Sequence, residues 1–196
     1  WIPDIVEKAK SLKVNAGVVA GTDVGPVIDS KAQAELSAHI ERMKKDATLT
    51  ASAAPSDDIG NFVTPHAFEI KNISQLEKEV FGPVLHIVRF KASEMQKVAD
   101  EINATGFGLT FGMHSRIEEN VAFFTSRIHA GNIYINRSMT GAVVGVQPFG
   151  GEGLSGTGPK AGGPYYLLKF LHERAITTNT AAIGGNVELL SRAFAL

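Results

Sequence analysis

The sequence has 196 residues, no cysteine, and a nearly balanced charge of 19 Lys and Arg against 20 Asp and Glu. A chain of this length can bury a core without cross-links, and the lack of cysteine excludes disulfides, thiolate metal sites and a cysteine nucleophile within these residues. The charge balance argues against nucleic-acid binding, and no apolar run approaches the roughly 20 residues of a membrane helix.

The first third of the chain predicts two helices followed by a loop. An apolar stripe with a proline in its first turn predicts a helix over residues 2–12. Ser30 and Gln33 have the spacing of a capping box, and the apolar pattern after them predicts a second helix. Residues 46–60 lack periodicity and are rich in turn-forming residues, which predicts an exposed loop.

The rest of the chain alternates β-prone runs with helical stripes. The expected elements are an extended segment at 68–70, a short helix capped at 74–77, a strand over 84–90, a helix from Ser93 to Gly106, a strand over 109–114, a helix over 117–128, a strand over 132–136, a short helix over 164–173 and a β-prone run over 175–180. This order predicts an α/β fold in which a parallel sheet is covered by helices.

Residues 141–163 are rich in glycine and carry no helical stripe. The spacing of Gly151, Gly153 and Gly156 matches the dinucleotide-binding fingerprint. The context disfavours that reading, because prolines and further glycines follow at once and no helix can begin there. We interpret the segment as a compact loop that forms the wall of a site. Lys160 could receive an anion there, although a solvated charge is the simpler reading.

The histidines do not form a metal-binding pattern. None stands three or four residues from another, so no metal site is expected and each is interpreted as a surface or packed polar residue. The six are His39, His66, His86, His114, His129 and His172. The Gly-x-Ser-x-Gly elbow of serine hydrolases is also missing.

The segment from Glu79 to Val84 leads from a short helix into a strand and has two readings. It could be a simple turn, in which Gly82 and Pro83 end the helix. It could also be a binding edge, because a carboxylate accepts both hydroxyls of a ribose diol and Phe81 could pack against the attached ring. Spacing alone leaves both readings open.

These residues, Glu-Val-Phe-Gly-Pro-Val at 79–84, resemble the E-[IV]-F-G-P motif of the aldehyde dehydrogenase superfamily. Residues 23–28 and 105–110 resemble two further short segments of that family. Residues 131–137 and 141–164 are very similar to the L-glutamate γ-semialdehyde dehydrogenase unit, also called 1-pyrroline-5-carboxylate dehydrogenase, of bacterial proline utilization A. The resemblance covers nearly the whole chain, and it corresponds to the carboxy-terminal portion of the family's dehydrogenase unit.

The resemblance implies an NAD-dependent enzyme of proline catabolism that oxidises L-glutamate γ-semialdehyde to glutamate. Glu79 would bind the nicotinamide ribose, and Phe81 would pack near the nicotinamide. The backbone N–H groups of Gly141 and Ala142 would hold the substrate carboxylate, and Phe149 would pack against its aliphatic stem. A glycine followed by a small residue suits this role, because consecutive N–H groups can then converge on an anion.

The resemblance also implies what this chain does not contain. The family's nucleophilic cysteine and general-base glutamate lie outside it, as does the NAD-binding domain, so the chain alone is expected to be inert. Residues 1–172 would be part of the catalytic domain, and 173–196 an oligomerisation strand and tail, with 175–180 crossing to a partner subunit. The implied partners are the rest of the dehydrogenase and further copies of the chain. FAD would be present only with an attached proline dehydrogenase domain.

A second interpretation is a non-catalytic module. Long proline utilization A proteins carry an additional aldehyde-dehydrogenase-like domain that serves assembly and covers the active site. Such a copy would not need Glu79, Phe81 or the pair Gly141 and Ala142, which favours the enzyme. Residues 1–17 depart from the pattern, because they look closer to methylmalonate-semialdehyde dehydrogenases. We expect a cytoplasmic protein, with peripheral membrane contact as an option for the full-length form.

Overall fold

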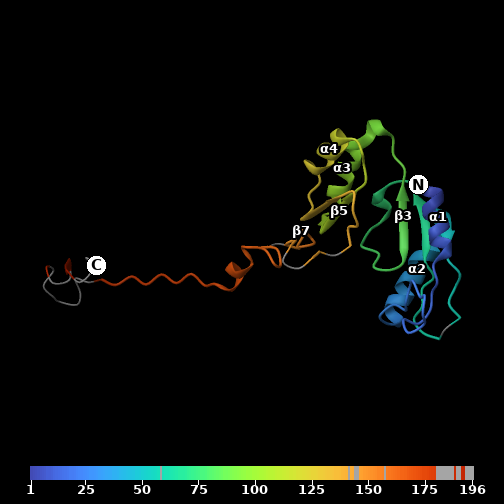
Figure 1. Ribbon diagram of the computed structural model, residues 1–196, viewed down its shortest axis with the longest axis horizontal. Coiled ribbons are helices and arrows are strands. Elements are labelled where there is room, and N and C mark those ends of the chain that lie inside the picture. The colour runs from blue at the N-terminus through green and yellow to red at the C-terminus, as the bar shows by residue number, and fades with distance from the viewer. Residues whose placement is uncertain are drawn as a thin grey trace. The chain divides into compact units, whose positions relative to one another are not determined.

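The structure is a computed structural model of the chain, and it describes residues 1–57, 59–140, 142–143, 146–156, 158–179, 188 and 191–192. Figure 1 shows its helices and strands, coloured along the chain. By internal packing the chain divides into two compact units. The first unit comprises Trp1–Thr140 with Gly151–Thr157, and the second comprises Gly141–Gly150 with Gly158–Leu196. The expected domain boundary after residue 172 stays a prediction.

Two helices open the first unit, as predicted. They are α1, Ile2–Ser11, and α2, Ser30–Asp46. The residue that caps α2 is Asp29 and not Ser30, because Asp29 has an extended backbone and its carboxylate accepts the N–H of Ala32 at 2.7 Å. A residue already inside the helix cannot take the capping position, so the predicted capping box is wrong: the cap is one residue earlier, and Ala32, three residues on, has no side chain that could complete a box.

A three-stranded sheet follows, with strand order β1-β2-β3. The strands are β1, Thr48–Ser52, β2, His66–Ile70, and β3, Val84–Val88, and the short 3-10 helix η1, Ile73–Gln75, lies between the last two. β1 is antiparallel to β2, and β2 is parallel to β3. The loop predicted over 46–60 is therefore wrong in part. β1 is a sheet-edge strand with a register shift between Leu49 and Ala51, so it shows no clear alternation of apolar residues.

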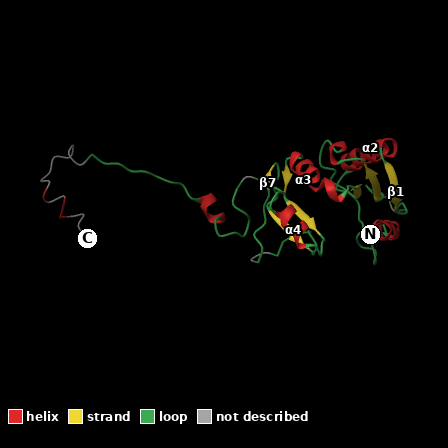
Figure 2. Ribbon diagram, turned by 90° about the horizontal axis from the view of Figure 1, so that it is seen from above, coloured by secondary structure: helices red, strands yellow, loops and turns green. Residues whose placement is uncertain are grey.

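The core of this region lies between α2 and the sheet. Leu36, Ile40 and Met43 form the buried face of α2, and they belong to one cluster with Phe68 and Ile70 of β2. α1 and α2 lie on opposite sides of the sheet (Figure 2). The apolar residues whose spacing predicts α2 are thus the same residues that pack against β2.

The second half of the first unit contains two smaller sheets. Its elements are η2, Ala92–Glu94, α3, Met95–Ala104, β4, Phe107–Gly108, β5, Thr110–Met113, α4, Glu118–Thr125, β6, Asn132–Ile135, and β7, Glu152–Gly153. β5 is parallel to β6, with α4 in the connection, whereas β4 is antiparallel to β7. Ala99, Phe124 and Ile128 form the buried cluster here.

The predicted α/β class is confirmed, but the arrangement of the strands differs from a single parallel sheet. In the described residues the strands form three small sheets with both parallel and antiparallel pairs. The antiparallel pairs arise because β1 returns directly onto β2, and because β4 pairs with a strand from the glycine-rich segment.

The second unit has little regular structure. Its described residues contain the 3-10 helix η3, Tyr166–Phe170, where a helix over 164–173 is predicted, and an antiparallel bridge between Phe149 and Ala161. Residues 175–179 are exposed and form no strand, while Thr180 lies outside the described residues. The proposed oligomerisation strand therefore stays a prediction. Among the described helices, none is long and apolar enough to cross a membrane.

Candidate functional site

A groove of about 800 Å³ lies within the first unit. Its lining comes from η1 and the loop after it, from β3, from the end of α3, and from the turn that carries β4. The lining mixes apolar side chains such as Leu76, Val80 and Leu154 with polar ones such as Glu79 and Thr105. Its volume and this mixed lining are typical of small-molecule sites, which span about 300–1,000 Å³.

Glu79 lies on the wall of this groove. Its side chain is exposed, and within the described part of the chain its carboxylate makes no hydrogen bond and no ion pair. The next residue, Val80, packs against the core cluster of α2 and β2. The backbone at Glu79 is therefore anchored to the core, while its two carboxylate oxygens remain available to donors from a ligand.

The shape of the loop around Glu79 depends on Gly82. The N–H of Gly82 donates to the oxygen of Val80 at 3.0 Å, and the N–H of Val84 donates to the oxygen of Gly82 at 2.8 Å. A Cβ added at Gly82 would lie 2.5 Å from Cδ1 of Leu36, which belongs to the buried face of α2. Any side chain at this position would therefore have to displace Leu36 from the packed face of α2, which favours glycine.

Phe81 lies differently from Glu79. Phe81 is 87% exposed, and it is not among the residues that line the groove. The structure therefore brings only one of the two predicted cofactor residues into the groove. The loop anchors Val80 between them and leaves the phenyl ring on the surface.

The turn at residues 105–110, which the sequence singles out separately, supplies another wall of the same groove. Thr105, Phe107 and Thr110 line it. The turn ends α3 with Gly106 at a φ of 74°, a conformation that favours glycine. The two segments with motif-like sequences, 79–84 and 105–110, thus both contribute to the lining of one groove.

The residues predicted to bind the substrate belong to the second unit. Phe149 is half-buried, and its backbone exchanges two hydrogen bonds of 3.0 Å with Ala161. Ala142 is half-buried, and within the described residues its N–H donates no hydrogen bond. Gly141 lies outside the described residues. A free N–H at Ala142 is compatible with an anion contact, and the carboxylate role stays a prediction.

Two histidines that the sequence does not connect lie in contact beside the groove. Nε2 of His39 on α2 is 2.9 Å from Nε2 of His86 on β3, and His86 lines the groove. Burial, followed by the positive charges of His39 and Arg42, lowers the pKa of His86 to about 4. The two residues are 47 positions apart, so no spacing rule for helices or strands could have paired them.

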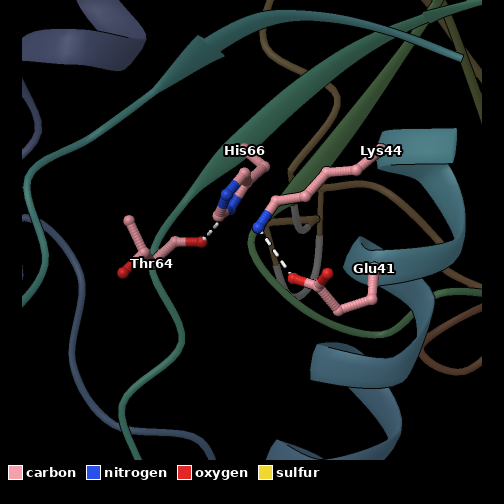
Figure 3. A network of polar contacts seen from close by, with 4 residues as sticks. All are labelled: Glu41, Lys44, Thr64 and His66. Atoms are coloured by element: carbon pink, nitrogen blue, oxygen red, sulfur yellow. Dashed lines mark hydrogen bonds and ion pairs between the residues drawn. The ribbon is translucent and has the colours of Figure 1, made fainter.

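A separate polar network lies at α2 and the start of β2, and Figure 3 shows it. Nδ1 of His66 donates to the backbone oxygen of Thr64 at 2.7 Å, and Lys44 forms an ion pair of 2.7 Å with Glu41. The hydrogen bond and charge of Lys44 lower the pKa of Glu41. These contacts satisfy the groups locally. In the described residues no three acidic, histidine or cysteine side chains come together as metal ligands.

The α/β architecture, together with a carboxylate-bearing groove, is typical of a domain that binds a small molecule. The family model described as the aldehyde dehydrogenase family matches residues 1–176, and the chain belongs to this family. It is similar to the bifunctional protein PutA of Salmonella typhimurium (strain LT2), with 54% identity over 160 residues. It is also similar to the 1-pyrroline-5-carboxylate dehydrogenase of Geobacillus sp. (strain WCH70), with 39% identity over 177 residues.

Solved structures agree with these relatives. A variant of proline utilization A (PutA) from Bradyrhizobium japonicum has a TM-score of 0.85 at 50% identity over 92% of this chain, which covers 18% of that chain. A 1-pyrroline-5-carboxylate dehydrogenase from Thermus with bound NAD has a TM-score of 0.79 at 34% identity over 87% of this chain, which covers 33% of that chain.

The chain spans only part of these relatives. The match covers 78% of this chain but 12% of the Salmonella protein, and 89% of this chain but 34% of the Geobacillus protein. Its membership of the aldehyde dehydrogenase family confirms the predicted resemblance. The expected position in the carboxy-terminal portion of a longer dehydrogenase stays a prediction.

Proposed function

We propose that this chain is part of an NAD-dependent L-glutamate γ-semialdehyde dehydrogenase, which oxidises the aldehyde to glutamate in proline catabolism. The observation that carries the proposal is the free carboxylate of Glu79 on the wall of the groove. The relatives support it, because they include proteins named PutA and 1-pyrroline-5-carboxylate dehydrogenase. A non-catalytic module would have no use for this exposed acceptor beside a cavity.

The residues of the groove fit the ribose of a dinucleotide. A carboxylate with both oxygens free can accept two hydrogen bonds from a diol, and hydrogen bonds to a charged group contribute about 1.5–3 kcal/mol each. The exposed ring of Phe81 offers an apolar face two residues further on. In the proposed site Glu79 holds and orients the ribose, and Phe81 shields the ring attached to it. NAD, when bound, accepts the hydride that the aldehyde carbon loses.

The carboxylate of the substrate is assigned to the second unit. Gly141 and Ala142 would donate backbone N–H groups to it, and Phe149 would pack on the aliphatic stem. Within the described part of the chain the N–H of Ala142 donates no hydrogen bond, which supports this assignment. Because the chain has no cysteine, the nucleophile of the proposed reaction must come from elsewhere in the complete enzyme. The 196 residues alone are accordingly expected to show no turnover of glutamate semialdehyde.

Replacing Glu79 by alanine tests the ribose assignment in the complete dehydrogenase that contains this chain. We expect Glu79→Ala to weaken NAD binding or hydride transfer by at least about 1.5 kcal/mol, the contribution of one charged hydrogen bond. Steady-state kinetics with varied NAD measure the effect. Glu77→Ala is the matched control, because Glu77 is also exposed and lines the same groove. Equal effects of both variants, or no effect of Glu79→Ala, would contradict the role.

Replacing Ala142 by proline tests the substrate assignment, because proline has no N–H to donate. We expect Ala142→Pro to raise KM for glutamate semialdehyde about tenfold, the loss of one charge-assisted hydrogen bond. The KM for a simple aliphatic aldehyde should change little, since that substrate has no carboxylate. The aliphatic aldehyde is therefore the internal control. A parallel rise for both substrates would point to a general distortion instead of a lost anion contact.

A further inference from the structure

A series of hydrogen bonds next to the groove has no part in the proposed function. His39 and His86 share the Nε2–Nε2 contact of 2.9 Å, with their ring centroids 5.1 Å apart and edge to face. The guanidinium of Arg42 lies 3.3 Å from Nδ1 of His39, and it donates to the backbone oxygen of Gln75 at 3.3 Å. These four residues, which we call the histidine brace, connect α2 with η1 and β3.

The protons in the brace follow from the donors available. Arginine only donates, so Nδ1 of His39 must accept, and neutral His39 then carries its proton on Nε2. That N–H donates to Nε2 of His86, whose own proton must lie on Nδ1. A proton added to Nε2 of His86 would set two N–H groups against each other. A proton added to Nδ1 of His39 would face the guanidinium. The brace is therefore complete only while both rings are neutral.

The charges around the brace favour this neutral state. Arg42 faces it from α2, and Lys78 faces it from the loop after η1, where its Nζ forms an exposed ion pair of 3.6 Å with Glu35. Burial, then the charges of Arg42 and Lys78, lower the pKa of His39, and similar causes bring the pKa of His86 to about 4. The brace is thus closed at neutral pH and opens on acidification.

The position of the brace determines what it holds. Gln75 is the last residue of η1, and residues 76–83, which we call the Glu79 loop, follow directly. His86 lies in β3, which begins where the loop ends. The brace therefore ties both ends of the loop to α2. The carboxylates of Glu77 and Glu79 line the same groove as His86, and so does that of Glu101 on α3. Displacement of the loop would therefore move Glu77 and Glu79, but not Glu101, relative to His86.

We propose that the histidine brace positions the Glu79 loop for the cofactor, and that protonation of the histidine pair releases the loop. That the loop binds the cofactor rests on the proposed function. That the histidine brace holds the loop in place does not depend on it. His39, Arg42 and His86 are positioning residues, because they act through the placement of Glu79.

Hydrogen exchange of the chain tests the fastening without any activity assay. His86→Leu removes the acceptor, and Arg42→Met removes the guanidinium but keeps an apolar stem. We expect either variant to lower the amide protection factors of Leu76 and Gly82, the loop amides that donate backbone hydrogen bonds, roughly five- to tenfold at pH 7, as for the loss of one hydrogen bond. The amides of α3 serve as the reference. If His86→Leu also loses protection at the amides of α3, that variant has failed to fold, and the result for Arg42→Met is used to test the proposal. Unchanged protection of the loop in a folded variant would overturn the proposal.

The response to pH separates a brace from simple packing. In the unchanged chain the protection factors of the loop should fall between pH 6.5 and 4, because protons then enter the pair. His86→Gln keeps an oxygen near the position of Nε2 and takes up no proton, so its loop should stay protected at both pH values. His172→Gln is the control, because His172 is exposed, and it should behave like the unchanged chain. If His86→Gln loosens on acidification as the unchanged chain does, the histidine pair is not the switch.

Kinetics of the complete dehydrogenase then distinguish this proposal from the proposed function. His86→Leu should raise KM for NAD by about the same factor as its loss of protection, with little change in kcat, and His86→Gln should restore it. If Glu79→Ala weakens NAD binding and the brace variants do not, the brace proposal fails and the ribose role stands. If Glu79→Ala has no effect, the ribose role fails. The hydrogen-exchange measurements alone then test whether the brace holds the loop.

Discussion

In the first unit, α2 and β2 turn their apolar side chains toward one another, and Phe68 and Met43 are completely buried. In the second unit no described residue is buried, and Leu167 and Phe170 of η3 are 73% and 67% exposed. Both units contain large apolar residues, so composition does not separate them. The difference lies in whether a second element of the same unit covers each apolar face.

This contrast shows where the stability of the chain comes from. Burial of apolar surface is the dominant favourable contribution to folding, so the first unit carries most of it. Several large apolar residues of the second unit, which include Tyr165, Leu168 and Leu171, are exposed. We therefore expect substitutions in the two units to have very different effects on stability.

The largest expected effect is at the centre of the first core. Phe68→Ala should lower the free energy of unfolding by about 3–5 kcal/mol, because it removes a buried aromatic side chain and leaves a cavity. Phe170→Ala in the second unit is the matched control, and it should change stability by less than about 0.5 kcal/mol. Urea denaturation followed by circular dichroism measures both. Similar losses for the two variants would mean that the second unit also has a core.

A smaller effect is expected where the backbone of the first unit packs closely. A Cβ added at Gly108 would collide with the backbone oxygen of His129, whose N–H is held at 2.9 Å by the side chain of Asn103. Gly108→Ala should therefore cost about 1–3 kcal/mol, since neither backbone can move away freely. Gly17→Ala is the control, because no atom lies within 4 Å of a Cβ added there. A neutral Gly108→Ala would show that this packing is loose.

The elements that could be predicted from the sequence are those with a strong apolar period. Leu36, Ile40 and Met43 recur at helical spacing, and all three are buried in α2. β3 and β6 were predictable because each is a run of mostly branched or aromatic residues. β1 could not be predicted in this way. It lies at a sheet edge, contains a bulge and pairs through its backbone, so its side chains show no regular apolar pattern.

The candidate site could be predicted only in part. The motif around Glu79 and the turn at 105–110 were both visible as strings of residues, but only the fold shows that they share a groove. The contact between His39 and His86 depends on how α2 packs on the sheet, and local spacing carries no information about it. Phe81 was predicted beside Glu79 because the two lie close in sequence. In the structure Glu79 is among the residues that line the groove, whereas Phe81 is not.

The smallest loss of stability that we expect in the first unit concerns the beginning of α2, and it tests the corrected capping residue. The carboxylate of Asp29 accepts the N–H of Ala32 at 2.7 Å, so Asp29→Ala leaves that N–H without its partner and should cost about 1 kcal/mol. Ser30→Ala is the matched control. Because Ser30 lies inside the helix, Ser30→Ala should leave the free energy of unfolding nearly unchanged. If Ser30 were the capping residue, as the sequence predicts, Ser30→Ala would lower it.

The same measurement extends the comparison to the second unit. η3 begins after Tyr165, whose side chain makes no capping hydrogen bond. Tyr165→Ala should therefore leave the free energy of unfolding within about 0.5 kcal/mol of the unchanged chain. Thermal unfolding of the three variants decides the matter. A loss for Ser30→Ala that matches Asp29→Ala would restore the capping box. A loss for Tyr165→Ala as large as that for Asp29→Ala would mean that η3 contributes to stability through contacts other than its cap.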